Sequence, residues 1–578
     1  MLPVNLGCPA SPQENAMNHA GTELHALFER HHAFRMQSQP EFATYEGDHR
    51  FNDQLSDLSE AAEDARFAQV QGFRHELSLM DRAALTPDDQ LNYDMFALLL
   101  DEQIDGHRFK AHYMPLNQMT GYQLSLPHLI DIQPLKAADQ FPDYFARLRA
   151  SAKQVDDVIA NLRLGIKTGL VQPRHVIEQV LPQLESLMAG KAQDSVFYLP
   201  LAQNMALGEA ERDKLGRELA ELIDTTVKPG YQKLHDFVKE TYLPACRETM
   251  GLWALPDGEA MYQYYIGVFT APGLHADEIH ELGLQEVARI EQEKNLLRQK
   301  LGFEGTVQDF NHHLRTSPDF VFESKEALWA EYERVMLEGT EKSAALFHRM
   351  PKAPCVLKEV ESYKAKSAPQ AYYMPAPEDG SRPGYYYLNT YDLPSRPTYA
   401  VTALTLHEAI PGHHLQLALA QELEGLPYFR RRMHITSYLE GWGLYAEFLG
   451  HQMNMYRDPY QHYGALSFEM WRACRLVVDT GLHHKRWTRQ QAIDFMKHHM
   501  SNSEHDIAAE VDRYLIMPGQ ALSYKIGEIK IKELRARAEQ QLGGRFDLRD
   551  FHEVVIRNGA VPLAVLEDQV DRWLVMAG

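Results

Sequence analysis

The pattern of apolar and polar positions along the first half of the chain is typical of amphipathic helices. From about residue 20 to residue 350, apolar residues recur at positions i, i+3, i+4 and i+7 between charged positions, as in 145–164. This spacing places the apolar side chains on one face of a helix. Helices are predicted at 208–224, 229–245, 275–301 and 325–348, with breaks at Pro-Gly pairs such as residues 229–230.

The pattern changes between residues 351 and 398, where Pro, Gly, Ser and Tyr accumulate. Residues 384–390 read Gly-Tyr-Tyr-Tyr-Leu-Asn-Thr, a short β-prone run between turn residues. The helical pattern returns after Pro397, first over 400–421, and continues almost to the end of the chain. We therefore predict a small strand-containing region between two helical regions.

The predicted organisation is one continuous structural unit with four regions. They are a flexible N-terminus (1–18), a helical region (19–350), a strand-containing region (351–398) and a second helical region (399–578). The composition, with 44% hydrophobic and 24% charged residues, is close to the average for globular proteins. A large folded core is therefore expected.

The charge and the N-terminus limit the classes of partner. A formal net charge of −22 argues against a nucleic-acid binder, because phosphate groups are bound by basic surfaces. Apolar runs of about 18 residues are absent, so no membrane span is predicted. The N-terminus lacks the features of a secretory signal, although residues 6–8 (Leu-Gly-Cys) are similar to a lipoprotein cleavage site. We expect a cytoplasmic protein, with the periplasm as the alternative.

The clearest chemical signal is the segment 407–414, which reads His-Glu-Ala-Ile-Pro-Gly-His-His. In zinc hydrolases, His-Glu-x-x-His on a helix provides two metal ligands and a glutamate that takes a proton from water. The four cysteines include no CxxC pair, so histidines and carboxylates are the expected ligands. Three imidazoles and a carboxylate among leucines need polar partners. We predict a Zn²⁺ site with His407 as a ligand and Glu408 as the general base.

The spacing leaves the second histidine ligand open, because the next histidines follow six and seven positions after His407 instead of four. Pro411 has no N–H to donate, so a regular helix cannot continue undisturbed through this turn, and Gly412 adds backbone freedom. If the extra residues loop out, His413 takes the place of the usual second ligand. In a regular helix, His414 would lie on the same side, about 10.5 Å further along. His413 is preferred, and His414 is the alternative.

A third ligand is expected from a downstream helix, and Glu440 is the candidate. It lies in the segment 437–447, which reads Ser-Tyr-Leu-Glu-Gly-Trp-Gly-Leu-Tyr-Ala-Glu, and the two glycines allow a close approach to the motif helix. Glu447, about two turns further along the same face, is expected to orient a ligand histidine. The pairs His312-His313 and His498-His499 lack an adjacent carboxylate in the sequence and are interpreted as surface or capping residues.

These motifs, together with the segments 475–484 and 518–525, resemble the bacterial family called domain of unknown function 885 over most of the chain. That family in turn resembles the helical zinc peptidases of the thimet oligopeptidase and carboxypeptidase Taq type, whose motif reads His-Glu-x-Gly-His. The resemblance implies a mainly α fold, a helical zincin-like ellipsoid with a deep cleft and a small β-sheet near the active site. The region 19–350 would wall the cleft, and 399–578 would be catalytic.

The resemblance also implies residues that act on a substrate. An edge strand carrying Tyr387 and Asn389 would bind an extended peptide by strand addition, with a buried hairpin as the alternative. Tyr524 would donate a hydrogen bond to the oxyanion, with Tyr514 and then His483 or His484 as other candidates. His483 is also a candidate for substrate binding, and Arg475 and Lys525 would bind a substrate carboxylate unless they are simple surface charges.

We therefore predict a zinc-dependent metallopeptidase that hydrolyses short peptides. A zinc hydrolase of a non-peptide amide or ester is the second hypothesis, and a non-catalytic binding protein with a degenerate zinc site is the third.

Overall fold

The structure, a computed structural model, describes residues 12–360, 365, 369–376 and 382–578. Residues 1–11 lie outside the described residues, and so does the Leu-Gly-Cys run at 6–8. Residues 12–18, predicted to belong to a flexible N-terminus, form the start of a helix. The prediction of a mainly helical protein with a small sheet is confirmed. None of the helices in these ranges is long and apolar enough to cross a membrane.

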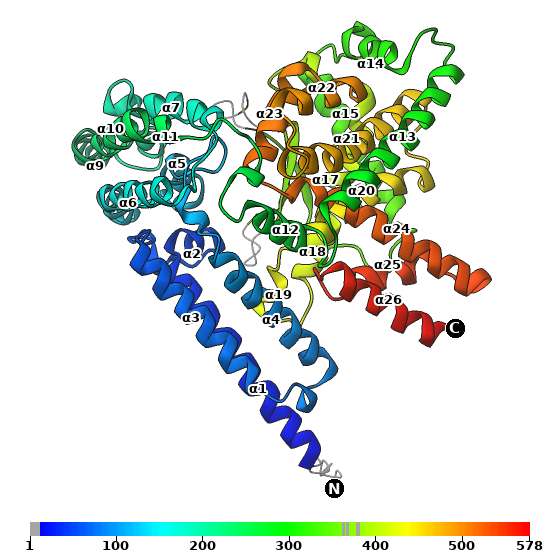
Figure 1. The fold of residues 1–578 in the computed structure, drawn as a ribbon, viewed down its shortest axis with the longest axis horizontal. Helices are drawn as coiled ribbons and strands as arrows, with labels where there is room; N and C mark the ends of the chain where they lie inside the picture. Colours follow the sequence, from blue (N-terminus) through cyan, green and yellow to red (C-terminus); the bar gives the residue numbers. More distant parts are fainter. Residues whose placement is uncertain (1–11, 361–364, 366–368, 377–381) are drawn as a thin grey trace. The chain divides into compact units, whose positions relative to one another are not determined.

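The chain forms two compact units (Figure 1). Unit 1 comprises Met1–Thr249 with Pro427–Phe429, and unit 2 comprises Met250–Leu426 with Arg430–Gly578. The boundary lies inside the segment 19–350, which the sequence analysis treats as one region. All predicted site residues belong to unit 2.

Unit 1 is built from helices whose ends follow local sequence signals. Thr86 caps the N-terminus of α4, and its hydroxyl accepts a hydrogen bond from the Asp89 N–H. The helices of this unit are α1 (Pro12–Ser38), α2 (Pro40–Glu46), α3 (Glu60–Ser78), α4 (Pro87–His107), α5 (Tyr122–Ile132), α6 (Phe141–Thr168), α7 (Arg174–Met188), α8 (Leu199–Ala202), α9 (Glu209–Leu222), α10 (Lys228–Phe237) and α11 (Leu243–Ala245).

The predicted break at residues 229–230 does not occur. The chain stays helical from α9 into α10, because a wider π-turn over Ile223–Val227 precedes Pro229. Pro229 then occupies the first turn of α10, where its missing N–H leaves no helical hydrogen bond unmade.

Unit 2 contains further helices and a three-stranded sheet. The helices are α12 (Gly258–Phe269), α13 (Ala276–Lys300), α14 (Val307–Thr316), α15 (Lys325–Ser343), α17 (Val401–Glu408), α18 (His413–Gln421), α20 (Thr436–Gln452), α21 (Pro459–His483), α22 (Arg489–His499), α23 (Glu504–Ile516), α24 (Ser523–Leu542), α25 (Leu548–Ile556) and α26 (Leu563–Ala577). Helix α19 (Tyr428–Arg431) crosses the boundary between the units.

The sheet has the strand order β1-β3-β2, with β1 (Cys355–Glu359) parallel and β2 (Ala371–Met374) antiparallel to the central strand β3 (Gly384–Leu388). Its central Tyr386 is fully buried, and the Tyr386 hydroxyl lies 3.4 Å from Thr405 Oγ1 of α17. The sheet therefore packs against the helix that carries His407. Helix α17 also packs against α15, α20 and α21, which buries it on every side.

Candidate metal centre

The link between α17 and α18 is an irregular turn that brings His413 beside His407. Helix α17 ends at Glu408, and α18 begins at His413. The His414 N–H donates to the Ala409 carbonyl, one residue further back than in an α-helix, at an N···O distance of 3.1 Å. The Trp442 indole N–H donates to the Pro411 carbonyl over 2.9 Å and holds the turn in place. The extra residues of the motif are thus taken up in this turn.

His407, His413 and Glu440 converge on one point. The Nε2 atoms of His407 and His413 lie 3.5 and 3.4 Å from the same oxygen, Oε2 of Glu440. The two imidazole rings are nearly perpendicular, with ring centroids 4.7 Å apart. Two ligands of one tetrahedral zinc ion, each bound at its usual distance, are about 3.4 Å apart. Both N···O separations therefore match those of ligands on a shared zinc ion, and all three ligand atoms lie within 4.8 Å of one another.

Two polar atoms of this cluster lack ordinary partners. Within the described residues, His413 Nδ1 and Glu440 Oε2 are buried and make no hydrogen bond. Leaving such a group unpaired costs about 1–3 kcal/mol, and more if it is charged. Burial raises the pKa of Glu440, but the imidazoles of His407 and His413 beside it outweigh burial and hold that pKa well below its usual value. Glu440 is thus a carboxylate, and the residues present fit a zinc ion.

His407 is held from behind by Glu447 and Gly443. Its Nδ1 donates to Glu447 Oε1 over 2.8 Å, so that Nε2 is free to face Glu440. Arg472 Nη2 lies 3.2 Å from the same oxygen of Glu447. A Cβ atom at Gly443 would lie only 2.6 Å from His407 Cε1, so the glycine allows the ring to pack directly on α20. Burial lowers the pKa of His407, but the neighbouring carboxylates of Glu440 and Glu447 raise it to about 9.

His414 faces away from this cluster. Its Nε2 donates to the Ala353 carbonyl over 3.0 Å, and its Nδ1 accepts from the Tyr373 hydroxyl over 2.8 Å. Burial lowers the pKa of His414 to about 4. Of the two alternatives left open by the sequence, the structure places His413, and not His414, opposite Glu440.

Glu408 and Tyr524 flank the cluster. Glu408 is 8% exposed and follows His407 at the end of α17. Burial, together with the negative charge of Glu408, raises the pKa of Cys355 on β1 to about 12. The Tyr524 ring of α24 lies 6.4 Å from the His407 ring, measured between centroids. Burial raises the pKa of Tyr524, so its hydroxyl keeps its proton at neutral pH.

The strand predicted to bind substrate is not an edge strand. Tyr387 lies in β3, which is paired on both sides, and its hydroxyl accepts a hydrogen bond from Lys358 Nζ over 2.9 Å. Asn389 is fully buried, and its amide donates to the Ala365 carbonyl over 2.7 Å. Both residues hold the sheet region together, so the edge-strand interpretation is corrected to that of an internal strand.

Lys525 and His483, which were also predicted to bind substrate, have partners inside the protein. Lys525 is 1% exposed, and its Nζ lies within 2.9 Å of the carboxylates of Glu286, Glu469 and Glu528. His483 is 1% exposed, accepts from the Leu252 N–H and donates to the Tyr514 carbonyl. The interpretation that they bind substrate is therefore corrected, because burial and internal partners keep both away from a ligand.

Arg475 is likewise buried. It donates to the Tyr514 hydroxyl and to Glu510, and its guanidinium carbon lies 4.5 Å from the centroid of the Tyr524 ring. Arg475 thus packs on Tyr524, and its buried Nη1 makes no hydrogen bond to a described residue, so its binding of a substrate carboxylate stays a prediction. The Tyr514 hydroxyl is occupied by Arg475, Trp471 and Glu510, so it is no alternative oxyanion donor.

Sequence reasoning missed Arg472 and the strand β1. Arg472 pairs with Glu447 but carries no motif signal of its own. Among the described residues, strand β1 forms one edge of the sheet and exposes 41% of Val356. The β-prone run of tyrosines led to the prediction of β3 as the substrate strand. Strand β1 has a mixture of apolar and charged residues, which is typical of an edge strand.

Comparisons with known proteins identify relatives of the whole chain. A family model described as "Bacterial protein of unknown function (DUF885)" matches residues 40–570. A crystal structure described as "the putative lipoprotein from Colwellia psychrerythraea" is 29% identical and covers 96% of this chain and 99% of its own, with a TM-score of 0.89.

A second solved structure, "a putative lipoprotein of unknown function from Shewanella oneidensis", is 19% identical. It covers 97% of this chain and 99% of its own, with a TM-score of 0.71, and shows the fold alone. Among curated proteins, none matches this chain. The comparisons thus establish the family and the fold, and the likeness to helical zinc peptidases stays a prediction.

Proposed function

The chain belongs to the bacterial family DUF885, and we propose that it is a zinc-dependent metallopeptidase acting on short peptides. Because the description of the family names no activity, the proposal is based on the site itself. The observation that carries the proposal is the convergence of His407 Nε2 and His413 Nε2 on one oxygen of Glu440. Two histidines and one glutamate are a ligand set of catalytic zinc sites, which keep one position open.

A zinc ion held by these three residues would lower the pKa of a bound water and polarise a carbonyl group. Glu408 follows His407 directly in the chain, and its carboxylate accepts the proton of the attacking water and then delivers it to the leaving nitrogen. The Tyr524 hydroxyl donates a hydrogen bond to the carbonyl oxygen as negative charge develops on it. Glu447 keeps the Nδ1 proton of His407 in place throughout.

The edge strand β1 favours a peptide over other amides or esters. Among the described residues it has a strand partner on one side only, and the charge of Glu408 acts on its first residue, Cys355. An extended peptide can add to such an edge through main-chain hydrogen bonds, which places its carbonyl groups along the strand. Exposed Val356 offers an apolar contact for one of its side chains. This proposal replaces β3 with β1 as the substrate strand.

The test is Glu408→Gln with metal analysis and a peptide library read by mass spectrometry. Wild-type protein is expected to bind zinc through the His407 cluster and to cleave peptides. The variant keeps this zinc and loses at least about 100-fold in turnover, because general-base catalysis contributes that much. The control is Glu424→Gln, which changes an exposed residue close to Glu408 in the sequence and is expected to leave zinc content and turnover unchanged.

The alternatives predict different results in the same assays. Zinc without peptide cleavage, but with turnover of ester or amide substrates, supports the non-peptide hydrolase. Zinc with no hydrolysis supports a binding protein. If the His407 cluster binds no zinc and no peptide is cleaved, the proposal is wrong.

The location of the protein belongs to the proposal as well. The sequence favoured the cytoplasm, whereas the relative from Colwellia psychrerythraea is described as a "putative lipoprotein". We therefore favour the periplasmic alternative for this chain. Cell fractionation of an epitope-tagged protein checks this, and recovery in the cytoplasmic fraction alone would contradict it.

A further inference from the structure

Two adjacent histidines at the end of α22 lie beside a glutamate of α13. His498 and His499 are the last two residues of α22, and Glu291 lies within α13. One ligand atom from each of the three residues lies within 4.8 Å of the other two. His499 Nδ1 and Glu291 Oε2 are 3.4 Å apart, close to the separation of two ligands on one zinc ion.

The contact between His499 and Glu291 is not an ordinary hydrogen bond. His499 Nδ1 is buried and makes no hydrogen bond to any described residue, although a carboxylate oxygen is only 3.4 Å away. A buried nitrogen without a partner is costly, and a cation between the two atoms would satisfy both. His498 is exposed, so the cluster is open to solvent on one side.

Gln308 of α14 holds the other two members of the cluster. Its side-chain amide nitrogen lies 3.0 Å from Glu291 Oε1 and 3.3 Å from His498 Nε2. The two ends of a glutamine amide can exchange by rotation, so Gln308 can present either a donor or an oxygen ligand here. The cluster therefore has a fourth polar group already in contact with it.

We propose that Glu291, His498 and His499 form a second metal site, which binds Zn²⁺ or a similar divalent transition metal ion independently of the His407 site. Imidazole and carboxylate groups suit such ions, and water or Gln308 completes the coordination. The site takes its ligands from two helices and links α13 to the C-terminal end of α22. His498 and His499 lack an adjacent carboxylate in the sequence, because Glu291 is about 200 residues away in the chain.

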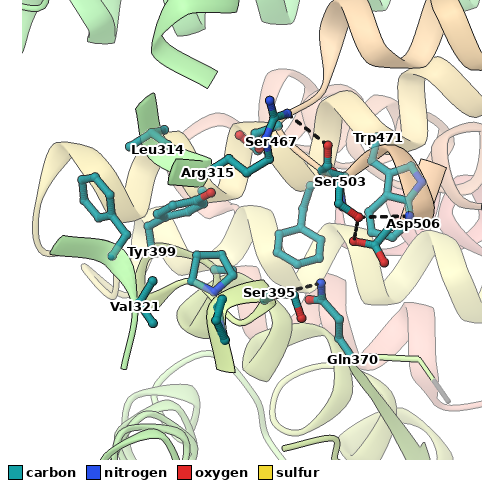
Figure 2. Close-up of a pocket in the computed structure, with 18 of the residues that line it drawn as sticks. Leu314, Arg315, Val321, Gln370, Ser395, Tyr399, Ser467, Trp471, Ser503 and Asp506 are labelled. Atoms are coloured by element: carbon teal, nitrogen blue, oxygen red, sulfur yellow. Dashed lines mark hydrogen bonds between the residues drawn. The ribbon is translucent and has the colours of Figure 1, made fainter. Parts of the chain in front are cut away.

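The metal site lies next to a cavity of about 270 Å³, and Figure 2 shows the side chains around it. The segment directly after His499 contributes Ser501, Asn502 and Ser503 to the cavity wall. The Asn502 carbonyl accepts a hydrogen bond from Arg315 of α14, and the His499 carbonyl accepts one from Asn311 of the same helix. A metal ion at His498 and His499 therefore fixes the segment that forms one wall of this cavity.

The test counts zinc ions in the full-length chain after chelator treatment and titration with Zn²⁺, followed by calorimetry. Wild-type protein is expected to bind two ions, and the double variant His498→Ala/His499→Ala one. The double variant His407→Ala/His413→Ala also binds one ion, the one at the second site. A His312→Ala/His313→Ala variant, which alters the neighbouring histidine pair of α14, keeps two ions.

Two further readouts separate the second site from a folding defect and from the proposed peptidase. Without zinc, the unfolding temperature of His498→Ala/His499→Ala is expected to match that of the wild type, and with zinc it is lower. The His498→Ala/His499→Ala variant is expected to keep the zinc ion at the His407 site. The proposal is overturned if wild-type protein binds a single ion that the His407→Ala/His413→Ala variant loses, or if His498→Ala/His499→Ala still binds two ions. Either result leaves the peptidase proposal to its own test.

Discussion

Glu447 controls which nitrogen of His407 faces Glu440. A neutral imidazole has one N–H, and the hydrogen bond of 2.8 Å from Nδ1 to Glu447 fixes the proton there. Because the pKa of His407 is raised to about 9, a metal ion would bind Nε2 by displacing the second proton of the ring. Arg472 shares the same carboxylate oxygen, so the charge of Glu447 is partly balanced inside the protein.

Replacing Glu447 with Gln is expected to weaken zinc binding at the His407 site by about 10- to 100-fold, because the amide is a weaker acceptor and leaves Arg472 unbalanced. Competition with a chelating dye measures the change. The control is Glu539→Gln, which alters a half-exposed carboxylate that pairs with Arg535 on α24. Equal zinc affinity in both variants would show that Glu447 does not position His407.

His552 gives the free energy of unfolding a defined pH dependence. It is fully buried, donates from Nδ1 to the Leu346 carbonyl and accepts from the Tyr445 hydroxyl, so it is neutral in the folded state. Burial lowers its pKa from 6.5 to about 3. Because the unfolded chain binds this proton more readily, the stability from neutral His552 is complete above pH 6.5. It is lost as the pH falls below that value.

Urea unfolding at pH 7 and pH 5 checks this effect. Between these values the wild type is expected to lose about 2 kcal/mol more than His552→Gln, since each pH unit below 6.5 costs about 1.4 kcal/mol. The exposed variant His505→Gln should follow the wild type. Parallel losses in wild type and His552→Gln would mean that His552 does not contribute.

Individual residues differ in how far the sequence predicts them. His407, Glu408, Glu440 and Glu447 stand out because their spacing within two short segments is itself the signal. The role of Lys525 is different, because two of its three carboxylate partners, Glu286 and Glu469, lie on helices distant in sequence. A buried ion cluster of this kind leaves no local pattern in the sequence. The sequence therefore gives no sign that Lys525 is paired with carboxylates.

At the scale of elements, glycines determine how closely the site helices pack. A Cβ atom at Gly441 would lie 2.5 Å from backbone atoms of Gly527, so α20 and α24 cross in direct backbone contact. Gly443 faces the other way, against the His407 ring. Close approach of the Glu440 helix was predictable from its two glycines, but the sequence did not reveal that each contacts a different helix.

Gly443→Ala is expected to displace His407 and to abolish zinc binding at that site, because the new Cβ would lie 2.6–3.0 Å from three ring atoms. Gly267→Ala in α12 is the matched control, because a Cβ there meets nothing within 4 Å. Alanine also favours a helix over glycine by roughly 0.5–1 kcal/mol, so the control is as stable as the wild type or more so. Metal analysis measures zinc binding and thermal unfolding measures stability in the two variants. Full zinc binding by Gly443→Ala would contradict the packing argument.

Helix limits were predicted well where the pattern is local and poorly where the backbone is irregular. The expected helix over 275–301 corresponds to α13, and the one over 208–224 contains α9. The stretch 400–421 is instead divided into α17 and α18, and the choice between His413 and His414 depends on a turn held by Trp442. Since that contact comes from another helix, hydrophobic periodicity could only leave the choice open.

For the whole molecule, the sequence predicted a mainly helical chain with a small sheet but not the division at Thr249. Amphipathic helices continue on both sides of this boundary, and composition does not change there. Domain boundaries of this kind are defined by which helices share a core, and periodicity within single helices does not contain that information.

The division makes tryptophan fluorescence a probe of unit 2 alone. All six tryptophans belong to that unit, at positions 253, 329, 442, 471, 487 and 573. Both candidate metal sites also lie there, so zinc should stabilise this unit and leave unit 1 unaffected. A ligand at 100 times its dissociation constant adds about 2.7 kcal/mol to the free energy of unfolding.

Thermal unfolding followed by tryptophan fluorescence and by far-ultraviolet circular dichroism tests this expectation. With zinc, the fluorescence midpoint should rise by several degrees over the chelator-treated sample, because a kcal/mol shifts a large domain by about 2–4 °C. Circular dichroism reports helices of both units, so it should contain an additional component, from unit 1, that zinc does not move. A fluorescence midpoint that is the same with zinc and with chelator would contradict metal binding in unit 2. A zinc-dependent shift seen only in the additional circular dichroism component, and not in the fluorescence, would place the metal in unit 1.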